Sequence, residues 1–175
     1  MAALVDRNFD GLAAKFARKI YSSYKGEVRL AVIWRDLEAS FTAAARPLQG
    51  PAARPLRVLD IGGGLGQFSC RLAALGHRIT YNDLSTQMLE LAQRSADESG
   101  CANNIEWRPG SYQPLVAALA KRDERYDLIL CHAVIEWLAA PQRLAAELAP
   151  LLAERGVLSL SYYNRHGWEY RNLLR

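Results

Sequence analysis

One segment limits the possible folds of this chain more than any other: Arg57-Val-Leu-Asp-Ile-Gly-Gly-Gly-Leu-Gly-Gln67. An apolar run over residues 58–61 predicts a buried strand, and the three alternate glycines that follow predict a tight turn. Residues 68–75 have the pattern of a helix that ends at Gly76. A strand, a glycine-rich turn and a helix in this order are typical of a Rossmann-like nucleotide site, because glycines allow a close approach of the ligand.

The spacing of these glycines separates two classes of cofactor. The dinucleotide fingerprint requires a further glycine where this chain has Gln67, which disfavours a nicotinamide oxidoreductase. The observed G-x-G-x-G spacing, preceded by Asp60 at the end of the strand, resembles motif I of the class I S-adenosylmethionine (SAM) methyltransferases. An ordinary glycine turn in an α/β protein has the same local pattern, so this segment alone does not identify the cofactor.

Composition favours one domain with a sizeable core. The chain has 175 residues, of which 50% are hydrophobic, and no apolar run is long enough to span a bilayer. Its start lacks the pattern of a signal peptide, so we expect a cytoplasmic protein. The three cysteines are scattered and fit neither a disulfide framework nor a metal-ligand spacing. A net charge of +4 allows a nucleic-acid partner without requiring one.

Strand and helix patterns alternate after the glycine turn. The further strand segments are 78–83, 105–108, 127–132 and 156–162, and the helical segments are 85–100, 114–122 and 142–152. Such alternation predicts a parallel sheet with right-handed crossovers.

Two helical patterns precede the glycine turn. Apolar residues recur at helical spacing over residues 9–20 and again over residues 30–41. Residues 21–26 read as a loop between them, and the alanine- and proline-rich residues 42–56 read as a linker into the first strand.

Candidate ligand contacts lie where the strands end, because ligands bind beyond the carboxyl ends of parallel strands. Asp83 follows the glycine turn by about twenty residues, where a carboxylate can accept hydrogen bonds from ribose hydroxyls. A charge at a helix start is the alternative role for Asp83. The third strand leads to Ser111 and Tyr112, where an adenine ring would meet a backbone N–H. His132 ends the fourth strand and is either a ligand contact or a packed core residue.

Two further segments extend the resemblance to class I methyltransferases. The segment Asp83-Leu-Ser-Thr-Gln-Met-Leu89 resembles the one after their second strand, and Tyr126-Asp-Leu-Ile-Leu-Cys-His-Ala-Val-Ile-Glu-Trp137 resembles their motif around strands four and five. The resemblance implies an α/β fold with a Rossmann-like class I methyltransferase sheet, in which helices flank parallel strands.

A narrower resemblance, to the bacterial tRNA 5-carboxymethoxyuridine methyltransferases, runs from Asp6 to Gly167. It rests on Asp6-Arg-Asn-Phe-Asp10, Lys25-Gly26 with Arg29, His132-Ala-Val-Ile-Glu-Trp137 and Tyr163-Asn-Arg-His-Gly167. That family methylates the carboxylate of a modified wobble uridine to its methyl ester. The resemblance therefore implies SAM as the cofactor and tRNA as the partner.

The same resemblance implies a set of cofactor-binding residues: Arg29, Gly62, Gly63, Asp83, Leu84, the backbone at Tyr112, and His132. The guanidinium of Arg29 would pair with the methionyl carboxylate of SAM. We expect no catalytic acid or base, because a carboxylate acceptor is already ionised at pH 7. We also expect no metal, since His132 and Glu136 lack a third convergent ligand. The family has small residues at the position before Gln113, whereas this chain has Tyr112 there. The chain therefore departs from the family where the adenine contact is expected.

The family's sheet has seven strands, whereas this chain shows five candidate strand segments. We therefore expect residues 51–175 to form a SAM-binding core that lacks the last two strands, with the fifth strand as an exposed edge. Residues 1–50 are expected to be helices that cover the cofactor cleft. Two alternatives remain open, a methyltransferase acting on a small molecule and a module that binds SAM without turnover.

Overall fold

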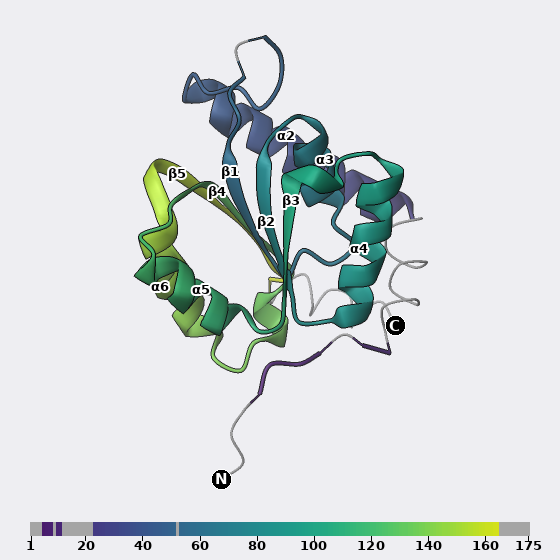
Figure 1. The fold of residues 1–175 in the computed structure, drawn as a ribbon, viewed down its shortest axis with the longest axis vertical. Helices are drawn as coiled ribbons and strands as arrows, with labels where there is room; N and C mark the ends of the chain where they lie inside the picture. Colours follow the sequence, from purple (N-terminus) through teal and green to yellow (C-terminus); the bar gives the residue numbers. More distant parts are fainter. Residues whose placement is uncertain (1–4, 9, 12–22, 52, 165–175) are drawn as a thin grey trace.

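The computed structural model describes residues 5–8, 10–11, 23–51 and 53–164 (Figure 1). The helix predicted over residues 9–20 therefore lies almost entirely outside the described residues. No helix among the described residues is both long enough and apolar enough to cross a lipid bilayer.

Five parallel strands form one sheet in the described part of the chain, which confirms the predicted fold class. The strands are β1 (Arg57–Ile61), β2 (Arg78–Asp83), β3 (Ile105–Pro109), β4 (Tyr126–His132) and β5 (Leu152–Ser161). Their order across the sheet is β3-β2-β1-β4-β5, and each neighbouring pair is parallel. The chain thus moves outward from β1 in one direction and returns to β4 on the other side. Ligands of open α/β sheets bind at the carboxyl ends of the strands where the order reverses in this way.

Helices cover both faces of the sheet, as Figure 1 shows. One face carries α2 (Tyr24–Ala43), α3 (Gln67–Ala74) and α4 (Thr86–Glu98), and the other carries α5 (Tyr112–Lys121) and α6 (Leu144–Leu148). Among the residues that the structure describes, the connections contain the 3-10 helices η2 (Ala102–Asn104), η3 (Ile135–Trp137), η4 (Pro141–Arg143) and η5 (Ala149–Leu151).

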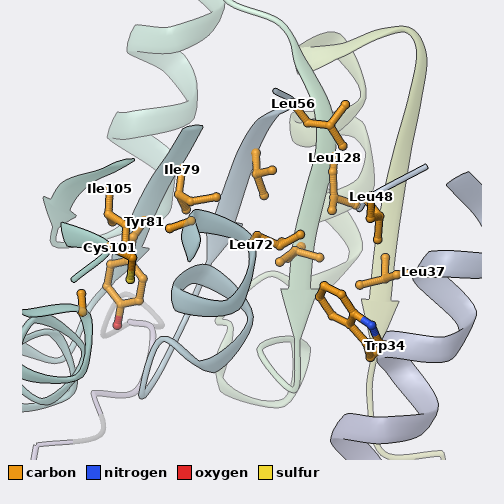
Figure 2. Close-up of a cluster of buried hydrophobic side chains, with 14 of the residues drawn as sticks. Trp34, Leu37, Leu48, Leu56, Leu72, Ile79, Tyr81, Cys101, Ile105 and Leu128 are labelled. Carbon is orange, nitrogen blue, oxygen red and sulfur yellow. The ribbon is translucent and has the colours of Figure 1, made fainter. Parts of the chain in front are cut away.

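The hydrophobic core joins α2 to the sheet. Trp34 and Leu37 of α2 belong to the same buried cluster as Leu72 of α3 and Leu128 of β4 (Figure 2). A second buried cluster, on the other face, contains side chains of α5 and α6. Because α2 shares a core with the sheet, its position over the carboxyl edge is fixed by packing.

The largest differences from the sequence prediction concern α2, β5 and residues 142–152. Helix α2 begins at Tyr24 instead of residue 30, because Ser23 caps it by accepting a hydrogen bond from the Gly26 N–H. Strand β5 begins at Leu152, four residues earlier than predicted. The helix predicted over residues 142–152 is divided into η4, α6 and η5. The 3-10 helices η4 and η5 each contain a proline near their start. Proline has no backbone N–H to donate, and at this position the loss does not interrupt a longer series of helical hydrogen bonds.

Candidate functional site

A cavity opens at the carboxyl edge of the sheet, where β1, β2 and β4 end. It brings together every residue that the sequence singled out for ligand binding: Arg29, Gly62, Gly63, Asp83, Leu84, Tyr112 and His132. Arg29 reaches it from α2, and the glycines come from the turn between β1 and α3. The ligand contacts of these residues stay predictions, but their convergence on one cavity is a property of the structure.

The glycine turn is packed so closely that side chains do not fit at two of its positions. At Gly62, which has φ +64°, an added Cβ would lie 2.5 Å from Cγ2 of Val134. At Gly63 an added Cβ would lie 2.4 Å from Cε2 of Tyr81 on β2. The Tyr81 hydroxyl donates a hydrogen bond of 2.6 Å to the Gly64 carbonyl, which holds the turn against β2. The turn therefore presents backbone, without side chains, to the cavity.

Asp83 connects the glycine turn to the start of α4. Its Oδ2 accepts a hydrogen bond of 2.8 Å from the Gly64 N–H, and its Oδ1 accepts one of 2.8 Å from the Ser85 N–H. Burial raises the pKa of this carboxyl, whereas the two backbone hydrogen bonds oppose that shift. Asp83 thus acts at the start of α4, which is the role named above as the alternative to ribose binding. It also lines the cavity.

Asp60 is a second buried carboxyl beneath the turn. It accepts a hydrogen bond of 2.6 Å from the Ser69 hydroxyl. Burial, with a smaller contribution from the neighbouring charge of Asp83, raises the pKa of Asp60 to about 7. This carboxyl supports the floor of the cavity while carrying only part of a negative charge near neutral pH.

His132 is neutral at pH 7 at the tip of β4. Burial and the positive charge of Arg29 lower its pKa to about 4. Its Nε2 lies 2.9 Å from the Ser159 hydroxyl oxygen on β5, and its ring meets the ring of Phe68 edge-on, with centroids 5.0 Å apart. Arg29 and His132 line the same cavity.

Tyr112 contributes to the cavity at the start of α5. Its hydroxyl donates a hydrogen bond of 2.8 Å to Oε2 of Glu147 on α6, and the side chain is buried. The phenol therefore ties α5 to α6. This arrangement is compatible with the predicted role of the Tyr112 backbone in meeting an adenine ring.

Sequence reasoning missed other residues that line the cavity: Asp6, Arg7, Leu30, Ile33, Phe68, Met88, Val134, Trp137 and Leu138. Leu30, Ile33 and Met88 lie in the segments 30–41 and 85–100, which the sequence predicted as helices. Helical periodicity does not distinguish a core contact from a cavity wall. The motif that begins at Asp6 was noted only as part of a resemblance. Within the part of the chain that the structure describes, no three His, Cys, Asp or Glu side chains are grouped to hold a metal ion.

Comparisons with known proteins agree on one family. A family model described as a methyltransferase domain matches residues 59–160. The tRNA 5-carboxymethoxyuridine methyltransferase of Escherichia coli (strain K12) is 40% identical over 169 residues, which are 97% of this chain and 61% of that protein. A ubiquinone biosynthesis O-methyltransferase of Chelativorans sp. (strain BNC1) is 33% identical over 141 residues, 79% of this chain and 51% of that protein. This chain therefore spans less than two thirds of the length of either relative.

Solved structures show the same fold at lower identity. The magnesium protoporphyrin IX methyltransferase from Synechocystis PCC 6803 with bound SAH aligns with a TM-score of 0.66 and 22% identity, over 94% of this chain and 74% of that one. The plantazolicin methyltransferase BpumL in complex with SAH aligns with a TM-score of 0.68 and 18% identity, over 92% of this chain and 57% of that one.

Proposed function

Because this chain belongs to the methyltransferase domain family, we propose that it transfers a methyl group from SAM to the carboxylate of 5-carboxymethoxyuridine at the wobble position of a tRNA. The observation that carries the proposal is the identity of 40% to a tRNA 5-carboxymethoxyuridine methyltransferase across 97% of this chain. The acceptor and the cytoplasmic location that a tRNA substrate implies belong to the proposal, since the chain spans 61% of that relative.

The charged and apolar side chains that line the cavity support SAM as its ligand. The glycine turn leaves its floor free of side chains, and Asp83 supplies a carboxylate at the tip of β2 for the ribose hydroxyls. Leu84 and Met88 offer an apolar wall for the adenine ring. Arg29 supplies the guanidinium that a methionyl carboxylate needs. His132 stays neutral, so it adds no positive charge beside a cationic sulfonium.

The side chains of this site act by orientation. Bound SAM supplies an electrophilic methyl group on a sulfonium that leaves as a neutral thioether. The carboxylate of Asp83 and the guanidinium of Arg29 would hold the two ends of the cofactor and so fix the direction of the methyl group. An acceptor carboxylate is ionised at pH 7, so no residue has to remove a proton.

Methyl transfer to tRNA tests the proposal. The purified protein would be incubated with SAM carrying a deuterated methyl group and with tRNA whose wobble uridine bears the free carboxymethoxy group. We expect mass spectrometry of the digested nucleosides to show the deuterated methyl ester. A tRNA with unmodified uridine at that position is the control and should stay unlabelled. An unlabelled carboxymethoxy nucleoside, from protein that binds SAM, would contradict the proposed acceptor.

A methyltransferase acting on a small molecule is the second candidate. It is favoured by the identity of 33% to a ubiquinone biosynthesis O-methyltransferase over 79% of this chain. The tRNA-modifying relative has both the higher identity and the fuller coverage of this chain. Label transfer to a phenolic acceptor, with none to tRNA, would favour this second candidate.

A further inference from the structure

We propose that the N-terminal strap, defined as residues 5–8 with residues 10 and 11, closes over the nucleoside half of the bound cofactor and brings Arg7 into contact with the adenosine. The identity of that cofactor rests on the proposed function. The strap is the dark purple segment in Figure 1, which passes below the edge of the sheet where the strands end.

The first part of the strap is fastened near the starts of η4 and α5. Asp6 accepts two hydrogen bonds of 2.7 Å, from the Ala139 N–H at Oδ1 and from the Gln113 side-chain amide at Oδ2. The N–H of Arg7 donates a hydrogen bond of 2.9 Å to the Trp137 carbonyl. One carboxylate thus joins the loop after β4 to the helix that follows β3.

The second part of the strap is fastened to the start of α4. Oδ1 of Asp10 accepts hydrogen bonds from the Ser85 hydroxyl, at 2.6 Å, and from the Gln87 N–H, at 3.3 Å. The Gly11 N–H donates to Oε1 of Gln87 at 3.3 Å. Ser85 directly follows Asp83 and Leu84, which line the cavity.

The two fastenings attach to different elements that line the cavity, the start of α4 and the loop after β4. Asp6 and Arg7 line the cavity together with Leu84 and Tyr112. The strap therefore connects the start of α4, which follows β2, to the start of α5, which follows β3, and to the loop after β4. The candidate ribose and adenine contacts lie after β2 and β3, whereas Arg29 lines the cavity from α2.

The chemistry of Arg7 suits an adenosine contact. A guanidinium is planar and stacks on aromatic rings, and a purine offers such a face. The hydrogen bond from its backbone N–H to Trp137 fixes where the side chain starts. A strap fastened on both sides must release at least one side before the cofactor can leave. Loss of either fastening should therefore speed dissociation more than it slows association.

Two ligands separate the halves of the cofactor. S-adenosylhomocysteine contains both halves, and 5′-methylthioadenosine contains the nucleoside without the amino-acid end. Asp10→Ala and Asp6→Ala remove hydrogen bonds to a charged carboxylate, and Arg7→Ala removes the stacked guanidinium. We expect each variant to weaken both ligands by a similar factor, about 10-fold. Stopped-flow dissociation of S-adenosylhomocysteine should show the change in the off-rate. Arg7→Lys should recover part of the affinity.

Matched variants show whether the effect belongs to the strap. Asp36→Ala removes an exposed carboxylate on α2 that pairs with the adjacent Arg35, and it should leave both affinities unchanged. Arg29→Ala should weaken S-adenosylhomocysteine while sparing 5′-methylthioadenosine. A strap that only stabilises the fold would lower the unfolding temperature of Asp10→Ala while leaving the off-rate of folded protein at the wild-type value, and this result would overturn the proposal.

The outcomes also separate the strap from the proposed function. Wild-type protein that binds S-adenosylhomocysteine but transfers no methyl group to tRNA would overturn the proposed acceptor and leave the strap standing. Unchanged off-rates in Arg7→Ala and Asp10→Ala would overturn the strap while methyl transfer to tRNA continued. Wild-type protein that does not bind S-adenosylhomocysteine would overturn both.

Discussion

Arg29 lies on α2, outside the sheet, and its positive charge helps to lower the pKa of His132 at the tip of β4. Both side chains line the same cavity. If Arg29 binds the methionyl carboxylate, Arg29→Ala should weaken SAM binding by about 1.5–3 kcal/mol, the range for hydrogen bonds to a charged group. Arg29→Lys should also lose affinity, because an ammonium does not reproduce the planar fork of the guanidinium.

Decarboxylated SAM provides the control for this prediction. It lacks the carboxylate, so calorimetry should show that the penalty of Arg29→Ala largely disappears with this ligand. An equal penalty for both ligands would mean that Arg29 stabilises the site without binding the carboxylate.

Asp60 predicts a pH dependence of stability. Its pKa is about 7 in the folded chain, above the ordinary value of 3.8, so folding favours the protonated form. The stabilisation is fully present below about pH 4 and is lost as the pH rises toward 7. We expect Asp60→Asn, which stays neutral and keeps an acceptor for Ser69, to lack this loss. Urea unfolding across this pH range measures the difference in unfolding free energy between wild type and variant. A difference that does not change with pH would contradict the raised pKa.

Prediction from the sequence succeeded for residues at strand tips and failed for the strap. Asp83 could be predicted because a strand pattern and a glycine turn together locate the carboxyl edge of β2. Asp6 could not, since its partners Gln113 and Ala139 are 107 and 133 residues away and no local pattern encodes such pairings. The second role of Asp83, accepting the Gly64 N–H, likewise required three-dimensional contacts.

At the scale of elements, Gly63→Ala tests the role of the glycine turn, with Gly76→Ala as its control. In Gly63→Ala the new Cβ would meet the ring of Tyr81, which is fully buried and held by its hydrogen bond to Gly64. We expect this overpacking to cost about 1–3 kcal/mol of unfolding free energy and to displace the turn, so that SAM binding also falls.

Gly76→Ala is the matched control for the turn. Gly76 has a positive φ, at +88°, which Gly63 does not, and a Cβ at Gly76 would meet nothing within 4 Å. It should cost about 1–2 kcal/mol of stability through backbone strain and leave SAM affinity unchanged. Thermal unfolding and calorimetry on both variants measure the two quantities. Equal losses of affinity in the two variants would contradict the role assigned to Gly63.

Element boundaries show where local patterns were insufficient. Residues 21–26 read as a loop because of their serines and Gly26, yet Ser23 caps α2 and Gly26 is buried in its first turn. The strands were predicted closely, since buried parallel strands are continuous apolar runs. The extension of β5 to Leu152 depends on its pairing with Tyr126 of β4, which is separated by a register irregularity from the rest of that ladder.

At the scale of the whole molecule, β5 is the edge of the described sheet, and Leu160 on it is exposed. The cavity lies at the carboxyl ends of the neighbouring strands β1 and β4, between which the strand order reverses. Helices from both faces of the sheet contribute to its lining. The residues proposed to bind SAM therefore all line one cavity of this chain. The tRNA contacts stay predictions, because the chain spans 61% of its tRNA-modifying relative.

The central claim is that the cavity at the carboxyl edge is a SAM site. Calorimetric titration of the wild-type protein with S-adenosylhomocysteine and, separately, with NAD tests it most directly. The G-x-G-x-G turn, with Gln67 where a dinucleotide site has glycine, and Asp83 at the tip of β2 predict saturable binding of S-adenosylhomocysteine and none of NAD. Saturable binding of NAD together with no heat from S-adenosylhomocysteine would contradict the account.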